Sequence, residues 1–345
     1  MIVTKNFNLL RIIRFAGHHF IWLIPLVIGV ALIQEYSGWE WVKVPFQPIS
    51  LVGTAVAFYL GFKNNQSYDR LWEARKVWGA VVNTSRAWAS NVKHFVSDQH
   101  TDNDVSDAEL NQYRKTLIYR HLAWLYALRS QLLIPTEWEH VSQKGMVGKY
   151  ANMRIQKYGL GQITDEITRA ELHTFLDAEE YENLKKFKNM STQIIDKQAE
   201  NLKLLRKENL IDDFKLAQLQ TLLNELYIHQ GKLERIKKFP LPRQYGSISF
   251  IFVGIFIVLL PFGMIPLFHG MGAWGLFLSI PLTALVAWVY LVMELVGDYS
   301  ENPFEGSAND IPMYSLCRTI EIDLREMLGE TDLPPAIEAK NGILM

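Results

Sequence analysis

The residues whose types could most readily carry out chemistry are a glycine motif and a pair of histidines. Residues 270–275 match G-x-G-x-x-G, the dinucleotide-binding fingerprint. That fingerprint requires a preceding strand and a following helix, whereas this copy lies inside a 50-residue stretch without Lys, Arg, Asp or Glu. We therefore interpret it as a glycine turn. His18 and His19 border another apolar stretch, which favours packing or headgroup contacts over a metal site.

Motifs for hydrolytic or redox catalysis are missing from the sequence. It contains no H-E-x-x-H, C-x-x-C or G-x-S-x-G, so metal and nucleophile catalysis have no support. An intramembrane enzyme would need ionisable side chains within its apolar stretches, and residues 244–293 contain only His269. Cys317 is the single cysteine, so no intrachain disulfide forms. We predict that the protein is not an enzyme.

A stripe of side chains in the second apolar stretch points instead to transport. Thr54, Phe58 and Phe62 recur at i, i+4 and i+8, so they share one face of a helix. Glycine and alanine are frequent among residues 53–61, and small residues let helices approach closely in lipid. The stripe is either a packing surface or, repeated around a symmetry axis, an apolar constriction that gates by dewetting.

The elements that position this stripe are membrane helices. Residues 15–34, 44–62 and 244–293 lack Lys, Arg, Asp and Glu, and they are 20, 19 and 50 residues long. A bilayer core needs about 20 apolar residues per helix, so the first two stretches fit one span each. The third fits two spans with a turn near Gly270, and the expected number of transmembrane helices is four.

Basic residues flank one end of each of the first three spans, and we place those ends on the cytoplasmic side. The flanking residues are Lys5, Arg11 and Arg14 before the first span, Lys63, Arg70, Arg75 and Lys76 after the second, and Lys232, Arg235, Lys237, Lys238 and Arg243 before the third. Both termini and the region between the second and third spans are therefore expected on the cytoplasmic side.

The region between the second and third spans has the pattern of a polar helical domain. Leu216, Leu219, Leu223 and Leu226 recur at helical spacing, and Gly and Pro are sparse from residue 164 to residue 238. Residues 63–243 carry 28 basic and 23 acidic side chains, which is not the dense basic stripe of a nucleic-acid-binding protein. We divide the chain into residues 1–65 with two spans, 66–240 as the cytoplasmic helical region, 241–296 with two spans, and 297–345 as a cytoplasmic C-terminal segment.

Three features together resemble the bestrophin family. The fourth span is followed by Asn302-Pro303-Phe304 and an acidic loop, the second span contains residues 60–62 as Leu-Gly-Phe with Arg70 eight positions further on, and four spans surround a helical insert. The resemblance covers nearly the whole chain. It implies an all-α integral membrane protein that assembles as a homopentameric pore in a bacterial inner membrane.

The resemblance also assigns roles to residues. It places Thr54, Phe58 and Phe62 at a hydrophobic neck on the second membrane helix, and a second, cytoplasmic aperture near Ala217. Bestrophins carry larger apolar residues at the position of Thr54, so its hydroxyl is expected to widen and wet the top of the neck. The permeant ions would be small and monovalent: anions in the animal family, with cations possible in bacterial members.

Calcium is the one metal that the resemblance raises. In animal bestrophins a run of acidic residues after Asn-Pro-Phe holds calcium, which requires several carboxylate and carbonyl oxygens. Here residues 305–310 read Glu-Gly-Ser-Ala-Asn-Asp, and only Asp310 keeps a carboxylate at a matching position. We expect no activation by calcium, and a loop docked on neighbouring helices with Phe304 as its apolar anchor.

Two functions from different classes follow from these observations. The first is a bestrophin-type pentameric ion channel, whose partners are copies of itself, membrane lipids and the permeant ions. The alternative is a membrane-anchored oligomeric sensor or scaffold, in which the spans only anchor the chain and the cytoplasmic helices bind a partner. A conductance measurement separates the two.

Overall fold

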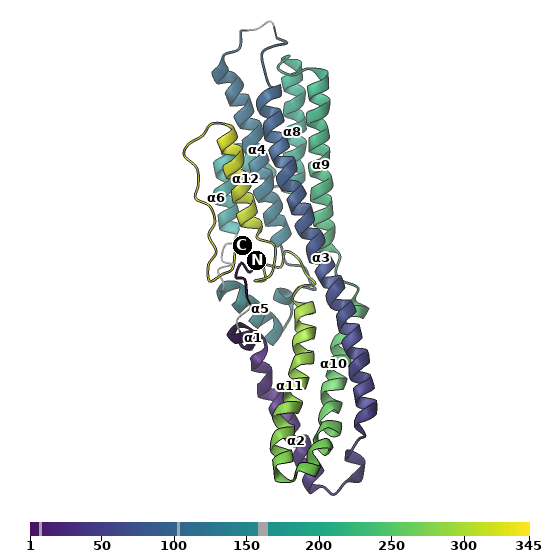
Figure 1. The fold of residues 1–345 in the computed structure, drawn as a ribbon. Helices are drawn as coiled ribbons and strands as arrows, with labels where there is room; N and C mark the ends of the chain where they lie inside the picture. Colours follow the sequence, from purple (N-terminus) through teal and green to yellow (C-terminus); the bar gives the residue numbers. More distant parts are fainter. Residues whose placement is uncertain (7–8, 102–103, 158–164) are drawn as a thin grey trace. The chain divides into compact units, whose positions relative to one another are not determined.

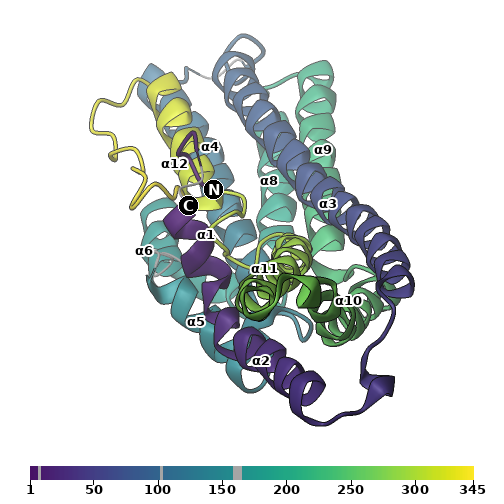
Figure 2. The ribbon, with the colours of Figure 1, turned by 60° about the horizontal axis from the view of Figure 1, so that its bottom comes forward.

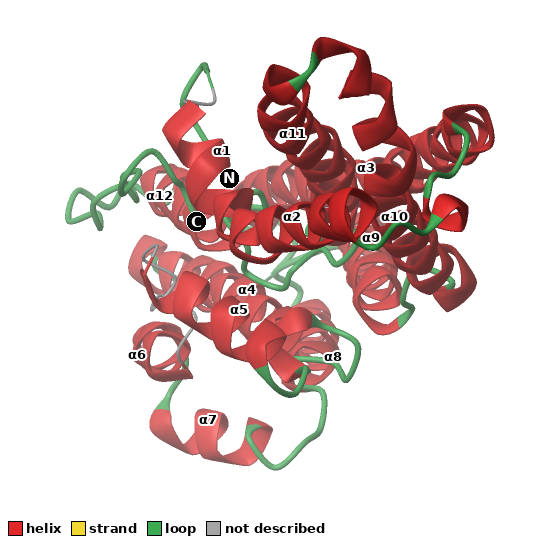
Figure 3. Cartoon of the chain, turned by 90° about the horizontal axis from the view of Figure 1, so that it is seen from below, coloured by secondary structure: helices red, strands yellow, loops and turns green. Residues whose placement is uncertain are grey.

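A computed structural model describes residues 1–6, 9–101, 104–157 and 165–345. Across these ranges the regular structure is helical, as Figure 3 shows. The only β pairings among the described residues are isolated bridges, between Ile2 and Ile343 and between Lys340 and Ile343. The chain divides into two compact units, which are described separately. The membrane unit contains residues 4–70 and 240–302, and the polar unit contains residues 1–3, 71–239 and 303–345.

The membrane unit contains the apolar helices that the sequence predicts. It comprises α1 (Leu9–Ala16), η1 (Gly17–His19), α2 (Phe20–Tyr36), η2 (Glu40–Val42), the first part of α3 (Phe46–Phe95), α10 (Arg243–Met264), η5 (Ile265–Met271) and α11 (Ala273–Asp298). Figure 2 shows α10 and α11 almost along their axes, with α2 beside them. Within the described residues, four helical segments are long and apolar enough to cross a membrane, which confirms the expected number of spans.

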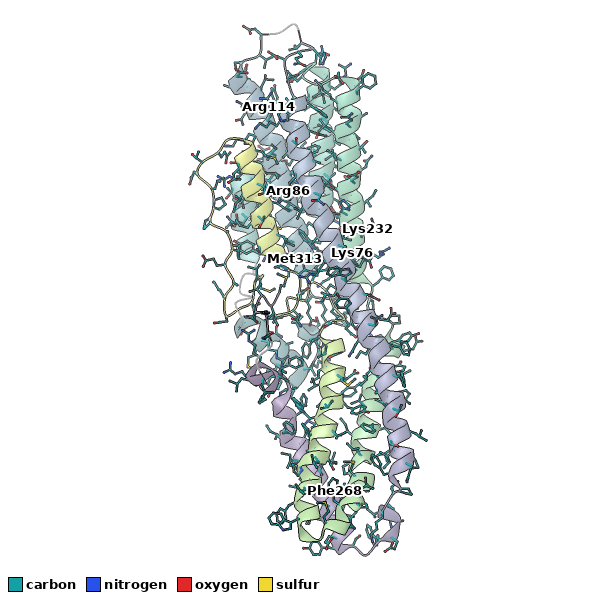
Figure 4. All side chains as sticks on the ribbon, in the orientation of Figure 1. Lys76, Arg86, Arg114, Lys232, Phe268 and Met313 are labelled. Carbon is teal, nitrogen blue, oxygen red and sulfur yellow. The ribbon has the colours of Figure 1, made fainter. Side chains whose placement is uncertain are left out.

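The glycine motif is part of the turn between the last two spans. Gly272 has φ +61° and precedes α11, a left-handed conformation that glycine adopts without steric cost. A Cβ on Gly275 would lie 1.9 Å from the carbonyl oxygen of Phe268, which is labelled at this end of the unit in Figure 4. The glycines therefore allow a tight connection between two helices. Helices α10 and η5 lead into the motif, so the strand that a dinucleotide fingerprint requires is not there.

Small residues bring the membrane helices together. A Cβ on Gly53 would approach the Phe256 ring to 2.7 Å, and a Cβ on Gly263 would approach Ile49 to 2.6 Å. Each glycine thus accepts a large apolar side chain from another helix, as expected where dispersion packing rather than water exclusion drives association. The core of the unit lies among α2, α3, α10 and α11.

The polar unit is a bundle of long helices with shorter ones beside it. It comprises the second part of α3, α4 (Asp107–Leu133), η3 (His140–Ser142), α5 (Met146–Lys157), α6 (Asp165–Phe175), α7 (Ala178–Leu184), α8 (Met190–Lys207), α9 (Asp213–Lys238) and α12 (Met313–Met327). Figure 1 shows α4, α8, α9 and α12 running along one another. The predicted helical character of this region is confirmed.

Local sequence signals determine where these helices begin. Ser106 and Glu109 form a reciprocal capping box at the start of α4, which satisfies two otherwise unpaired backbone N–H groups. Asn189 and Asp212 accept backbone hydrogen bonds at the starts of α8 and α9. Trp78, Trp88 and Trp124 are fully buried in the core, so a tryptophan-rich interior holds the bundle.

Candidate functional site

The stripe predicted on the second span lies on the exposed side of α3. Phe58 and Phe62 are 68% and 70% exposed in the single chain, and Thr54 is exposed as well. Val56, Leu60 and Lys63 are buried, at 4%, 0% and 1% exposed. At about 100° of rotation per residue these two sets lie on opposite sides of the helix. One side of α3 therefore anchors it in the unit, and the other presents an apolar surface.

Two details of this stripe were not evident from the sequence motif. The Thr54 hydroxyl donates to the carbonyl oxygen of Ser50 at 2.9 Å, so its proton is used within the helix and the side chain presents its methyl group alongside oxygen lone pairs. Leu51 shares the exposed side and is 72% exposed. Its position, seven residues before Phe58, is the signal that would have extended the stripe by one turn.

A buried ion pair holds the opposite side of α3. Lys63 Nζ lies 2.5 Å from Glu294 Oε1 on α11, and both side chains are at most 4% exposed. Ser249 Oγ on α10 lies 2.9 Å from the same carboxylate oxygen. Ionisable groups in a membrane bundle are costly unless paired, so this contact strongly constrains the rotation of α3. The sequence signal was a lone Lys and a lone Glu, each directly bordering an apolar stretch.

The residue after Lys63 extends this anchor. Asn64 Nδ2 donates to the carbonyl oxygen of Met293 at 3.0 Å. A Cβ on Gly297 would lie 2.0 Å from Asn64 Oδ1, so α11 approaches α3 closely where glycine leaves room. Together these contacts tie the end of the apolar part of α3 to the last membrane helix.

The loop after the last membrane helix is organised by Asp310. In the polar unit, Asp310 Oδ1 accepts backbone N–H groups of Phe304 at 2.9 Å and Ile311 at 2.8 Å, and Oδ2 accepts that of Gly306 at 2.8 Å. Burial raises the pKa of the Asp310 carboxyl, and the three backbone donors oppose that rise. Both carboxylate oxygens are therefore engaged in closing the loop.

Phe304 and Glu305 dock this loop on the rest of the polar unit. Phe304 is fully buried with φ +70°, and its carbonyl oxygen accepts from Lys237 Nζ at 3.3 Å. Glu305 Oε2 lies 2.9 Å from His140 Nδ1. Lys237 also pairs with Glu139 at 2.5 Å, and burial raises the pKa of Glu139 while Lys237 opposes that rise. The loop is thus fixed by α9 and η3.

Asn302 and Pro303 stand at the boundary between the two units. Asn302 belongs to the membrane unit and is 6% exposed, and Pro303 begins the last segment of the polar unit. The Asn-Pro-Phe motif therefore connects the final membrane helix to the docked loop.

The family model for bacterial and fungal bestrophins matches residues 11–326 of this sequence. The chain belongs to this family. The sequence resemblance is thereby confirmed, and it extends over both units.

Curated relatives of this bestrophin are named as channels. The voltage-dependent anion channel-forming protein YneE of Salmonella typhimurium is 25% identical over 309 residues, 90% of this chain and 85% of that protein. The voltage-dependent anion channel-forming protein mll4386 of Mesorhizobium japonicum is 29% identical over 289 residues, 84% of this chain and 76% of that protein. These relatives are named as channel-forming proteins and not as enzymes.

A solved bacterial bestrophin shares the fold. The crystal structure of the Klebsiella pneumoniae homologue matches with a TM-score of 0.73 and 21% identity, covering 91% of this chain and 99% of that one. At this level of identity the likeness concerns the fold, and the roles of individual residues are argued from this chain.

The position assigned to a cytoplasmic aperture lies on an exposed face of α9. Ala217 is exposed, and its carbonyl oxygen accepts from Thr221 at 2.8 Å. Phe214, one turn earlier, is 85% exposed. The sequence mapping missed Phe214, although its i−3 spacing from Ala217 places both residues on neighbouring parts of one face. The larger apolar side chain at this end of the bundle is therefore Phe214.

The described residues do not gather into a metal centre. No group of three or more His, Cys, Asp or Glu side chains within that part of the chain converges to hold a metal ion. At the family loop, the oxygens of Asp310 face backbone donors. The Asp310 carboxylate therefore closes the loop through hydrogen bonds from the loop backbone.

Proposed function

We propose that this bestrophin is a homopentameric channel of the bacterial inner membrane that conducts small monovalent ions, and that these ions are anions. The observation that carries the proposal is the α3 surface. Phe58 and Phe62 are exposed directly opposite the buried Lys63 and Leu60. A helix that is held by a buried ion pair on one side and is apolar on the other is suited to line a pore around a symmetry axis.

The neck would consist of Thr54, Phe58 and Phe62 from each copy, with Leu51 extending it by one turn. Phe58 and Phe62 are about 6 Å apart in helical rise. Rings of such side chains form a dry collar, in which an ion sheds water without gaining a polar partner. Because the Thr54 hydroxyl donates its hydrogen bond to the carbonyl oxygen of Ser50, the collar offers a passing anion no hydroxyl hydrogen at this level.

The cytoplasmic aperture would be narrowed by the exposed face of α9. Ala217 is too small to restrict a wide opening, whereas Phe214 is the more exposed and larger side chain. We assign the aperture to the Phe214–Ala217 turn, with Phe214 as its apolar contact.

The orientation follows from charge and from the pairing of the chain ends. In the polar unit the backbone N–H of Leu344 donates to the carbonyl of Met1 at 2.8 Å, and that of Val3 donates to Gly342 at 3.0 Å. The two ends therefore share one side of the membrane. The basic residues flanking the spans support a cytoplasmic location for that side.

The sign of the permeant ion is the part that the relatives support most directly, since they are named anion channel-forming proteins. The test is a reversal-potential measurement on the purified protein in planar bilayers under a KCl gradient. A reversal potential near the chloride equilibrium value supports the proposal. A potential near the potassium value would replace anions by cations, and an absence of conductance in reconstituted oligomers would favour the sensor or scaffold.

A further inference from the structure

The first helix of the membrane unit has two faces of opposite character. Leu9, Leu10 and Ile13 of α1 are between 47% and 66% exposed. Arg11 lies on the far side of the helix and Arg14 at the flank, about 150° and 90° from the centre of this apolar face. Eight residues that segregate leucine and isoleucine from arginine in this way make a short amphipathic cationic helix.

The C-terminal end of α1 is held by residues of the last membrane helix and of the turn that follows it. Trp288 Nε1 donates to the carbonyl oxygen of Ala16 at 3.0 Å, and the Phe15 ring packs edge-on against Tyr299 with centroids 5.4 Å apart. Gly17 ends the helix where a Cβ would lie 2.9 Å from Ile13. The apolar residues of the first turn are thus left facing outward from an anchored helix.

The helix with this apolar face directly precedes a membrane span in the chain. η1 leads from α1 into α2, whose Ile21 and Trp22 are exposed. Trp22 donates to His19 Nδ1 at 3.0 Å, and tryptophan and histidine at the start of a span are typical of the membrane–water interface. Ile21 is therefore an exposed apolar residue on a segment long and apolar enough to cross a membrane, and α1 directly precedes it, separated only by η1.

The charge of the other face selects the lipid. Lys5 and Arg14 have no ion-pair partner among the residues that the structure describes. Arg11 donates to the Thr4 hydroxyl at 2.9 Å. No acidic residue occurs between Met1 and Gln34. Basic side chains beside a membrane surface attract anionic headgroups.

We propose that α1 is an interfacial helix that binds anionic phospholipid. Leu9, Leu10 and Ile13 insert at the boundary of the acyl chains. Arg11 and Arg14, with Lys5, contact the headgroup phosphates. This surface is separate from the α3 stripe and does not depend on ion conduction.

Native mass spectrometry of the full-length protein tests the binding. Phosphatidylglycerol and phosphatidylcholine are titrated against the wild type, Arg11→Gln/Arg14→Gln, and a control, Lys203→Gln/Lys207→Gln, that removes two exposed charges on α8. We expect the first variant to bind phosphatidylglycerol about thirtyfold more weakly, at about 1 kcal/mol per basic residue, and the control to be unchanged. Equal phosphatidylglycerol binding by the wild type and the α1 variant would overturn the proposal. Arg11→Lys/Arg14→Lys, which keeps both charges, should retain binding.

A nitroxide label locates the apolar face. Ile13→Cys can be labelled selectively, because Cys317 is fully buried and burial raises its thiol pKa to about 12. In phosphatidylglycerol nanodiscs we expect high collision with oxygen at position 13, as at a Leu32→Cys control in the α2 span. Low accessibility to both oxygen and a water-soluble relaxant would show that a second copy covers the face, which would contradict the lipid assignment.

Discussion

At the scale of single residues, the proposed gate depends on two phenylalanines. Replacing Phe58 and Phe62 with Ala would remove the aromatic collar and admit water. We expect a larger and more persistently open single-channel conductance, with the size-exclusion profile unchanged. Phe250→Ala on α10 is the matched control, since Phe250 is 65% exposed in the same unit but lies outside the stripe. Intact oligomers of the double variant with wild-type conductance would remove the neck from α3.

Asp310 carries a different prediction, because it accepts three backbone hydrogen bonds. Asp310→Ala leaves buried donors unpaired at a cost of about 1–3 kcal/mol each before relaxation. We expect a markedly lower thermal midpoint in EGTA and no effect of calcium on wild-type current. Asp196→Ala, an exposed acid on α8, should leave the midpoint nearly unchanged. A calcium-dependent current that Asp310→Ala abolishes would contradict a purely structural loop.

Sequence patterns predicted that Thr54, Phe58 and Phe62 share one face of a helix, but not which other residues lie on that face. Phe58 and Phe62 follow from helical spacing, whereas Leu51 looks like any other leucine of an apolar span until the exposed side of α3 is known. Phe214 was missed for a similar reason, since a single aromatic beside polar residues does not reveal which face of α9 is covered. Exposure depends on which helices pack together, and periodicity supplies only the shared face.

At the scale of elements, α3 combines the proposed pore surface with an internal anchor. Removing one partner of a buried ion pair costs about 3–5 kcal/mol, whereas replacing both by apolar residues is often neutral. We therefore expect Lys63→Met and Glu294→Met each to lower the thermal midpoint, and the double variant to recover most of the loss. Altered open probability in the single variants is expected as well, since the pair constrains the rotation of α3.

The control for this cycle is an exposed ion pair of the polar unit. Arg86, labelled in Figure 4, pairs with Asp323 on α12 at 2.6 Å, with side chains 46% and 28% exposed. Breaking it by Arg86→Met should cost about 0–1 kcal/mol. If the losses from Lys63→Met and Glu294→Met simply add in the double variant, the two residues are not coupled.

At the scale of the whole molecule, hydrophobic stretches and helical periodicity were sufficient to predict the helix class and the four spans. The bilayer makes this possible, because a spanning chain must satisfy its backbone within each helix. The division of the chain into two units was harder to predict from the sequence. The polar unit includes residues 1–3 and 303–345 as well as residues 71–239, and pairing between distant segments leaves no local signal at either one.

Assembly is the last prediction, and the channel mechanism requires it. One copy presents a single α3 stripe, which cannot enclose a pathway, so several copies must surround an axis. Closed rings follow when a heterologous interface repeats by a rotation that closes. We expect a detergent-solubilised particle of about 200 kDa of protein, five times the chain mass of 39.9 kDa. Light scattering corrected for bound detergent measures this mass. Phe58→Ala/Phe62→Ala should give the same value, because the collar faces the axis. A stable monomer or dimer that still conducts would show that the pathway lies within a chain, and the stripe on α3 would then be a surface for lipid.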